Sequence, residues 1–302
     1  MNKSIRFLSI ITILALAFLL LNVIGKENIP FLKNVSDKYE IKAVKIPAYL
    51  ELAGERVPTE RADVREKMDR ELLVNTYWQS NGLLVIKRAN KIFPILEPLL
   101  EKYGLPDDFK YLAVAESALL VNNPSHARAS GLWHFLPSTA KEKRFKLEVN
   151  KNVDERYHIE KSTAAAAIYL KRAKEKFGSW TLAAASYNCG MGRVSERLRN
   201  QEVTSYYDAL LPDETERYIY RILALKEVMN NPKKYGFVFD QEDLYQPEET
   251  YTVKVDTAIT NIAAFAKNYG ITYKELKRHN PWLRQGKLNN KSRKLYNIKI
   301  PR

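Results

Sequence analysis

Glu116 is an isolated acidic residue in an apolar stretch, and its surroundings determine the chemistry it could perform. It is the only charged residue in the range 111–125, although 28% of the whole chain is charged. Its neighbours at helical spacing are aliphatic: Leu112, Ala113, Leu119 and Leu120. Because apolar surroundings disfavour a carboxylate anion, we expect the pKa of Glu116 to rise towards neutrality, as a general acid requires. The alternative is a buried structural glutamate paired with a distant arginine or lysine.

A second stretch, residues 130–139, reads Ser-Gly-Leu-Trp-His-Phe-Leu-Pro-Ser-Thr. Gly131 permits a backbone conformation or a close approach that other residues resist. Trp133 and Phe135 offer apolar faces beside polar groups, which a groove for sugars needs; the alternative is ordinary core packing of the two rings. Pro137 suits the first turn of a new helix.

Tyr187 and Asn188 stand at the end of a helix predicted for residues 180–188, where polar side chains can face a cleft. Gly190 is typical of a helix C-terminal stop. Cys189 has no histidine or base near it in the sequence, so we interpret it as a small buried hydrophobe rather than a nucleophile. It is the single cysteine of the chain, which excludes an internal disulfide framework.

Helical periodicity between residues 59 and 240 must position these stretches. We predict helices from 59 to about 80 with Thr59 as the cap, then at 83–93, 94–104, 105–116, 154–176, 180–188 and 212–229. Asn81-Gly82 is expected to interrupt the helical pattern, and Pro94 to open a new helix. Residues 26–58 and 241–250 contain prolines and weak patterning, which predicts linkers.

Residues 251–302 have a different pattern, with alternating strands at 251–255 and 296–300 and helical spacing at 257–268 and 272–279. This predicts a βααβ module close to the lower size limit for independent folding. The module carries twelve lysines and arginines against Asp256 and Glu275, within a chain of formal net charge +14. Such a basic surplus favours a polyanion: a wall polymer, a membrane surface or nucleic acid.

The N-terminus has the pattern of an export signal. Lys3 and Arg6 precede a largely apolar run at residues 7–24. The run is long for a cleaved peptide and close to the minimum for a membrane span, so residues 1–25 are predicted to be either a signal peptide or an anchor. No cysteine occurs here, which excludes a lipid-modified N-terminus. We therefore expect a periplasmic or cell-envelope protein.

Four ordered motifs resemble the lytic transglycosylases with a lysozyme-like domain, and most closely the membrane-bound murein transglycosylase D group. The motifs are Glu116-Ser117, residues 131–139, residues 185–190, and Glu214-Thr215 with Tyr218. The similarity extends from about residue 51 to residue 239, and residues 251–301 resemble a LysM module, a binder of N-acetylglucosamine polymers.

The resemblance implies a mainly α fold. A lysozyme-like catalytic domain would occupy residues 59–240, with a helical N-terminal part at 59–104 and a catalytic core at 105–240. A small βααβ LysM-like domain at 251–302 would follow the linker. In that domain the usual Gly-Asp-Thr turn of the family is reduced to Asp256-Thr257.

The resemblance also implies roles for individual residues. Glu116 would be the single catalytic acid and base, with Ser117 as its hydrogen-bonding partner. The residues implied to line the glycan groove or to hold the acid in place are Ser130, Gly131, His134, Tyr187, Asn188, Glu214 and Tyr218. His134 stands where the family usually has glutamine, so we expect that contact to depend on pH.

The implied activity is cleavage of the bond between N-acetylmuramic acid and N-acetylglucosamine in peptidoglycan, leaving 1,6-anhydro ends. Peptidoglycan strands would be the partner, and no cofactor or metal is expected, since the four histidines lack metal-ligand spacing. The alternatives are a hydrolytic muramidase and a non-catalytic peptidoglycan-binding protein. Nucleic-acid binding by the basic tail suits the charge but not the export segment, so no nucleic-acid partner is expected.

Overall fold

The structure is a computed structural model that describes residues 41–125 and 127–302. Residues 44–302 form one compact unit. Of the other unit, residues 1–43, only residues 41–43 are described, and they form neither helix nor strand. The predicted signal peptide or anchor, residues 1–25, lies outside the described residues. Among the helices that are described, none is long and apolar enough to cross a membrane.

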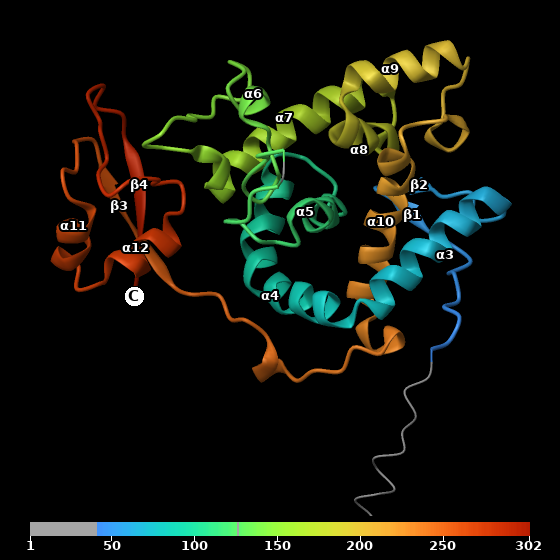
Figure 1. Cartoon of the computed structure of the whole chain (residues 1–302), viewed down its shortest axis with the longest axis horizontal. Coiled ribbons are helices and arrows are strands. Elements are labelled where there is room, and N and C mark those ends of the chain that lie inside the picture. Colours follow the sequence, from blue (N-terminus) through green and yellow to red (C-terminus); the bar gives the residue numbers. More distant parts are fainter. Residues whose placement is uncertain (1–40, 126) are drawn as a thin grey trace, which may run out of the picture. The chain divides into compact units, whose positions relative to one another are not determined.

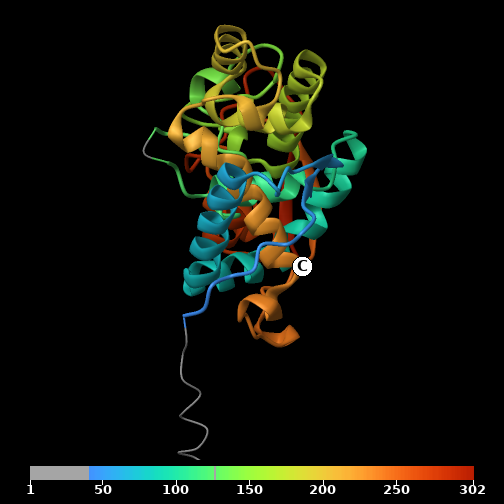
Figure 2. The same cartoon turned by 90° about the vertical axis from the view of Figure 1, so that its right-hand side faces the viewer.

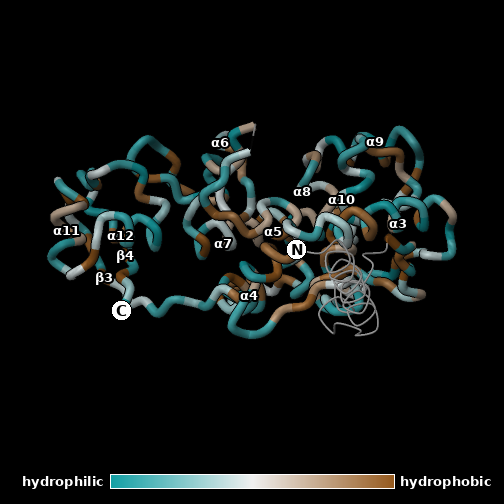
Figure 3. The backbone as a smooth tube through the Cα atoms, turned by 60° about the horizontal axis from the view of Figure 1, so that its bottom comes forward, coloured by the Kyte–Doolittle hydropathy of each residue, from teal (hydrophilic) through white to brown (hydrophobic). Residues whose placement is uncertain are grey.

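Helices form most of the compact unit before residue 240 (Figure 1). They are α3 (Ala62–Tyr77), α4 (Gln79–Lys102), α5 (Phe109–Ser117), α6 (Pro137–Ala140), α7 (Ile159–Phe177), α8 (Trp180–Cys189), α9 (Met191–Asn200) and α10 (Asp213–Asn230). The apolar helix α5, largely brown in Figure 3, packs against α4 and α10. Figures 1 and 2 both show α3 beside α10. The predicted mainly α-helical fold is confirmed.

The first two helices differ from the sequence prediction at their boundaries. The Thr59 hydroxyl does not cap a helix but donates to the Ala48 carbonyl at 3.1 Å, and α3 begins at Ala62. The prediction of separate helices at 83–93 and 94–104 is wrong, because α4 continues through Pro94 and Pro98. Each proline removes one main-chain hydrogen bond. Burial of one apolar face offsets that loss: Val85, Ile86, Ala89, Ile92, Leu96 and Leu100.

A short antiparallel hairpin, β1 (Glu51–Leu52) and β2 (Glu55–Arg56), precedes α3 and holds the start of α8. The Glu55 carboxylate accepts hydrogen bonds from the Ser179 hydroxyl at 2.7 Å and from the Thr181 amide at 2.9 Å. The Lys174 ammonium pairs with it at 2.9 Å. Burial alone would raise the pKa of Glu55, but these hydrogen bonds together with that of the Trp180 amide lower it to about 2.

The C-terminal module is the predicted βααβ arrangement, with β3 (Thr250–Val255), α11 (Ile262–Asn268), α12 (Tyr273–His279) and β4 (Tyr296–Pro301). The two strands pair antiparallel, with Tyr251 opposite Ile300. Asn261 caps α11, which therefore begins five residues after the predicted start, and Thr272 and Glu275 form a capping box on α12. The inward side chains close a separate apolar core: Val255, Ile262, Leu276, Trp282, Ile298 and Ile300.

Replacement of Glu55 by glutamine should destabilise the fold in a pH-dependent way. The pKa of Glu55 in the folded state lies below its ordinary value near 4.3. Its stabilising contribution is therefore full above that value and is lost as the pH falls towards 2. We expect Glu55→Gln to lower the free energy of unfolding by about 2 kcal/mol at pH 7 and by much less at pH 3, measured by urea denaturation.

The matched control is Glu60→Gln, because Glu60 belongs to an exposed ion pair with Arg56. This control should leave the free energy of unfolding unchanged at both pH values. An equal loss for Glu55→Gln at pH 7 and pH 3 would contradict the assignment of the carboxylate as the anchor of α8.

Candidate active site

Glu116 lies in the last turn of α5, directly before the chain leaves the helix. Ala118 and Leu119 both adopt left-handed backbone conformations, with φ of 49° and 60°, and these end the helix. The Arg88 guanidinium donates to the Ala118 carbonyl at 3.1 Å, and the Leu119 side chain is buried. The end of α5 is therefore fixed by contacts on both sides of the chain, which sets the direction of the Glu116 side chain.

The Glu116 carboxyl is largely withdrawn from solvent, with 15% of its side chain exposed. Burial raises its pKa to about 7. The hydroxyl of the buried Tyr218 on α10 donates to Oε1 and lowers the pKa, as does the Arg221 cation, while the Glu214 carboxylate raises it. The balance leaves a carboxyl group whose pKa lies near neutral pH.

His134 is the polar side chain on the other side of this carboxyl. Its Nδ1 lies 3.9 Å from Glu116 Oε2, too far for a direct hydrogen bond. Burial lowers the pKa of His134, and a backbone hydrogen bond with Asn123 opposes that shift only in part, so the ring is neutral at pH 7. Its buried Nε2 has no hydrogen-bond partner among the residues that the structure describes. His134 therefore lines the cavity as a neutral imidazole whose unpaired nitrogen is shielded from solvent.

Aromatic side chains form one wall around these groups. The Tyr187 hydroxyl donates to the Trp133 carbonyl at 2.8 Å, and its ring meets those of Tyr169 and Phe135 edge to face. Trp133 itself is fully buried, and its indole nitrogen donates to Thr163 Oγ1 at 2.9 Å. Trp133 is thus a core residue, so the core-packing alternative applies to this ring. Phe135 lies at the cavity surface.

Asn188 and Glu214 come from two helix ends that meet at the same site. Asn188 is in the last turn of α8, and its Oδ1 accepts a hydrogen bond from the Thr215 hydroxyl at 2.7 Å. This contact orients the carboxamide. Glu214 follows in the first turn of α10, exposed to solvent. Asn188 contributes a carboxamide and Glu214 a carboxylate to the lining of the cavity described below.

These elements enclose a cavity of about 600 Å³. Six of the residues predicted from the sequence line it: Glu116, His134, Tyr187, Asn188, Glu214 and Tyr218. The structure brings these six together from α5, α8, α10 and the segment 130–136, which are separated by up to about a hundred residues in sequence. Whether each contacts a substrate stays a prediction.

Three predicted residues do not line the cavity. The Ser117 hydroxyl donates back to the Ala113 carbonyl of its own helix at 3.1 Å, away from Glu116. The buried Ser130 accepts a hydrogen bond from the Tyr157 hydroxyl at 3.2 Å. Gly131 has a φ of +80°, and a Cβ there would lie 1.8 Å from the Arg156 carbonyl oxygen. These positions make Ser130 and Gly131 supports of the cavity wall.

Arg221 and Tyr169, which were not predicted from the sequence, also line the cavity. Arg221 follows Tyr218 by three residues and Glu214 by seven, so the three share one face of α10. That spacing is a signal that could have identified it. Tyr169 lies in an alanine-rich helix whose pattern indicates only close packing. Among the described residues, no group of histidine, cysteine, aspartate and glutamate side chains could hold a metal ion.

Comparisons with known proteins match both parts of the chain. Residues 94–209 match the family described as Transglycosylase SLT domain. Residues 251–302 match the family described as Soluble lytic transglycosylase C-terminal LysM-like domain. The resemblance predicted from the four motifs is confirmed by these matches.

Individual proteins are similar to this chain over only part of its length. Membrane-bound lytic murein transglycosylase D of Escherichia coli strain K12 is 30% identical over 178 residues, which are 57% of this chain and 38% of the relative. A Putative tributyltin chloride resistance protein of Alteromonas sp. is 34% identical over 33% of this chain and 48% of its own length. An X-ray structure of an inactive mutant of lytic transglycosylase Slt from Pseudomonas aeruginosa aligns with a TM-score of 0.39 and 23% identity, covering 51% of this chain and 26% of that one. The chain thus spans less than half of the length of these curated relatives.

Replacement of Gly131 by alanine should disrupt the wall that carries His134. The added Cβ would overlap the Arg156 carbonyl and would also occupy a left-handed backbone position. We expect Gly131→Ala to lower the free energy of unfolding by about 3 kcal/mol or more. The control is Gly178→Ala, where φ is +69° but no atom lies within 4 Å of the new Cβ. That variant should lose only about 1 kcal/mol, and equal losses in chemical denaturation would contradict the close packing at Gly131.

Proposed function

We propose that this chain, in which a transglycosylase SLT domain precedes a LysM-like domain, is a peptidoglycan lytic transglycosylase. The observation that carries the proposal is the Glu116 carboxyl, with a pKa near 7, at the surface of a cavity of about 600 Å³. A general acid works best when its pKa lies near the operating pH. We assign catalysis to residues 59–240 and wall binding to the module at 251–302, joined by the segment 241–250.

The proposed substrate bond is the β-1,4 linkage from N-acetylmuramic acid to N-acetylglucosamine. Protonated Glu116 gives its proton to the glycosidic oxygen, and the bond between that oxygen and C1 of the muramic sugar breaks. Glu116, now an anion, takes the proton from the C6 hydroxyl of the same sugar. The C6 oxygen then bonds to C1 and closes a 1,6-anhydro ring, so the acid returns to its starting state.

One protein carboxyl suffices for this sequence of steps. Retaining glycosidases place a second carboxyl about 5 Å from the first as a nucleophile. In the part of the chain that the structure describes, Glu214 is the only other acidic side chain in the cavity lining, and it is exposed. The acetamido oxygen of the substrate can stabilise the cationic sugar carbon instead, as in substrate-assisted enzymes.

Tyr218 and Arg221 suit the first half of the reaction, in which Glu116 gives up its proton. Both favour the Glu116 anion, Tyr218 through its donated hydrogen bond and Arg221 through its charge. They therefore make the buried acid strong enough to release its proton to the substrate. Tyr187 and Asn188 offer ring surface and amide hydrogens beside it, as polar sugars with apolar faces require.

We assign this reaction to the cell envelope. The support is the export pattern of residues 1–25 together with the E. coli relative, which is named as membrane-bound and as acting on murein. The basic LysM-like module would hold the wall polymer, with its positive charge matching an anionic matrix.

Glu116→Gln should abolish cleavage, because the amide cannot donate and recover a proton at this position. We expect the rate of muropeptide release from purified peptidoglycan to fall by at least about a thousandfold. Products of the unmodified chain, analysed by mass spectrometry, should lack one water at the muramic end. Fragments that all carry free reducing ends would contradict the transglycosylase proposal and favour a hydrolytic muramidase.

Tyr218→Phe should shift the pH dependence of the rate. The Tyr218 hydroxyl lowers the pKa of Glu116, so its removal raises that pKa. Because the protonated acid is the active form, the decline of kcat/KM with rising pH should move to higher pH while the maximal rate falls. The control is Tyr220→Phe, on the same helix and outside the cavity lining. A shift to lower pH in Tyr218→Phe, or an equal shift in both variants, would contradict this role.

A further inference from the structure

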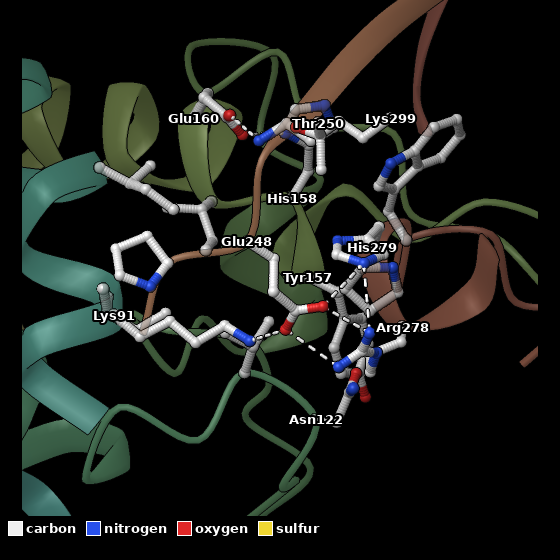
Figure 4. A pocket seen from close by; sticks show the side chains of 17 residues that line it. Lys91, Asn122, Tyr157, His158, Glu160, Glu248, Thr250, Arg278, His279 and Lys299 are labelled. Carbon is white, nitrogen blue, oxygen red and sulfur yellow. Dashed lines mark hydrogen bonds and ion pairs between the residues drawn. The ribbon is translucent and has the colours of Figure 1, made fainter. Parts of the chain in front are cut away.

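The C-terminal module is held against the helical part of the compact unit by side chains as well as by the connecting chain. Figure 4 shows the Glu248 carboxylate between Lys91 of α4 and Arg278 of α12. Lys299 of β4 forms an ion pair with Glu160 of α7. These pairs border a cavity of about 330 Å³ between the module and helices α4 and α7. The predicted linker 241–250 therefore does not separate the two parts.

A second line of contact runs through the segment 152–157 of the catalytic part. The Asn152 side chain donates to the Lys287 carbonyl at 2.5 Å and accepts from the Asn289 amide at 2.7 Å. The Asn152 carbonyl accepts from the Arg284 amide at 2.9 Å. Asn152 is buried, so these bonds are shielded from water. One asparagine thus ties the loop between α12 and β4 to the catalytic part.

The next residues of the segment belong to the apolar core of the module. Val153 is fully buried and Tyr157 is 5% exposed, both within the cluster that contains Leu283 and Trp282. The Asp154 amide donates to the Trp282 carbonyl at 2.9 Å. The module therefore completes its core with residues of the catalytic part.

The opposite side of the same segment holds the wall of the active-site cavity. The Arg156 guanidinium donates to the carbonyl of Arg128 at 2.9 Å and to that of Phe135 at 3.0 Å. Asp154 orients the guanidinium through bonds of 3.0 and 2.7 Å. Both side chains are less than a tenth exposed. The two carbonyls bracket residues 128–136, which we call the active-site loop and which carries His134.

We propose that the C-terminal module acts as a brace for the active-site loop, with Asp154 and Arg156 as positioning residues that transmit its docking to the cavity wall. The module fixes residues 152–154, Asp154 fixes Arg156, and Arg156 fixes both ends of the loop. Tyr157 adds a parallel connection, since its ring lies in the module core and its hydroxyl donates to Ser130. The module would then contribute to the reaction by geometry, in addition to any sugar that it binds.

Two adjacent lysine and arginine residues of the module allow a matched test in the full chain. Lys294 pairs with Glu148 and Glu155 of the catalytic part, whereas Arg293 pairs with Asp256 inside the module. Lys294→Glu places a third carboxylate against two others and should loosen docking. Arg293→Glu makes the same charge change without crossing the interface. Hydrogen–deuterium exchange is measured by mass spectrometry on peptides covering residues 128–136 and 148–158.

We expect at least about tenfold faster exchange in both peptides for Lys294→Glu and no change for Arg293→Glu. Faster exchange at 148–158 with an unchanged active-site loop would overturn the brace, and so would unchanged exchange in both peptides. Should Lys294→Glu unfold the chain, Asn152→Ala replaces it, because it removes the side-chain hydrogen bonds of Asn152 to Gln285, Lys287 and Asn289 and leaves the charges intact. The same exchange results in the two peptides then support or overturn the proposal.

A kinetic measurement accompanies the exchange and rests on the proposed function. On short soluble glycan fragments, a displaced loop should lower kcat severalfold with little change in KM, whereas a module that only binds the wall would leave kcat unchanged. The exchange result does not depend on activity. If the chain cleaves no glycan at all, the proposed function fails while the brace is still tested.

Discussion

Burial of the Glu116 carboxyl determines how the helices around the cavity must pack. An anion at this position loses solvation, and its neighbours restore only part of it through Tyr218 and Arg221. The surrounding helices must therefore pack tightly enough to keep water from the carboxyl while leaving the cavity open on one side. Helix α5 meets that demand by ending at Ser117, before the left-handed Ala118 and Leu119, so that the Glu116 side chain lies at a helix end beside the cavity.

Two opposing influences set the strength of this acid. Burial and the Glu214 carboxylate favour the protonated form, while Tyr218 and Arg221 favour the anion. A carboxyl governed by burial alone would have a still higher pKa, and one governed by the hydrogen bond and the cation alone would have a lower pKa. The first turns of α10 carry three of the four influences, Glu214, Tyr218 and Arg221, on one face. Side chains of α10 thus set the pKa of Glu116, whereas α5 sets its position.

Local patterns in the sequence predicted those features that arise from contacts close in the chain. The isolation of Glu116 among aliphatic residues indicated a buried acid, and the alternation at both ends of the tail indicated β3 and β4. Helix α9 was missed because it is short and strongly charged, and only Val194 of this helix is buried. The continuity of α4 through Pro94 depends on tertiary burial, which overrides the local signal of a proline.

Long-range contacts explain the remaining differences. Trp133 is a core residue because Thr163, thirty positions away, receives its indole hydrogen bond. Ser117 follows the catalytic candidate in sequence, yet the helix turns it towards Ala113. The support of the active-site loop by Arg156 and by the C-terminal module joins residues that no local pattern connects. Sequence spacing identifies the members of such a site, and only packing determines which of them face the cavity.

Titration of Glu116 itself shows whether its carboxyl is buried strongly enough to act as an acid near neutral pH. In the full chain labelled with ¹³C at glutamate side-chain carboxyls, the Glu116 signal can be assigned by its absence in Glu116→Gln and followed by NMR across pH. We expect a titration midpoint near 7 for this carboxyl. A midpoint near the ordinary value of about 4.3 would show a solvated carboxylate and would refute the burial of Glu116 as the source of its raised pKa.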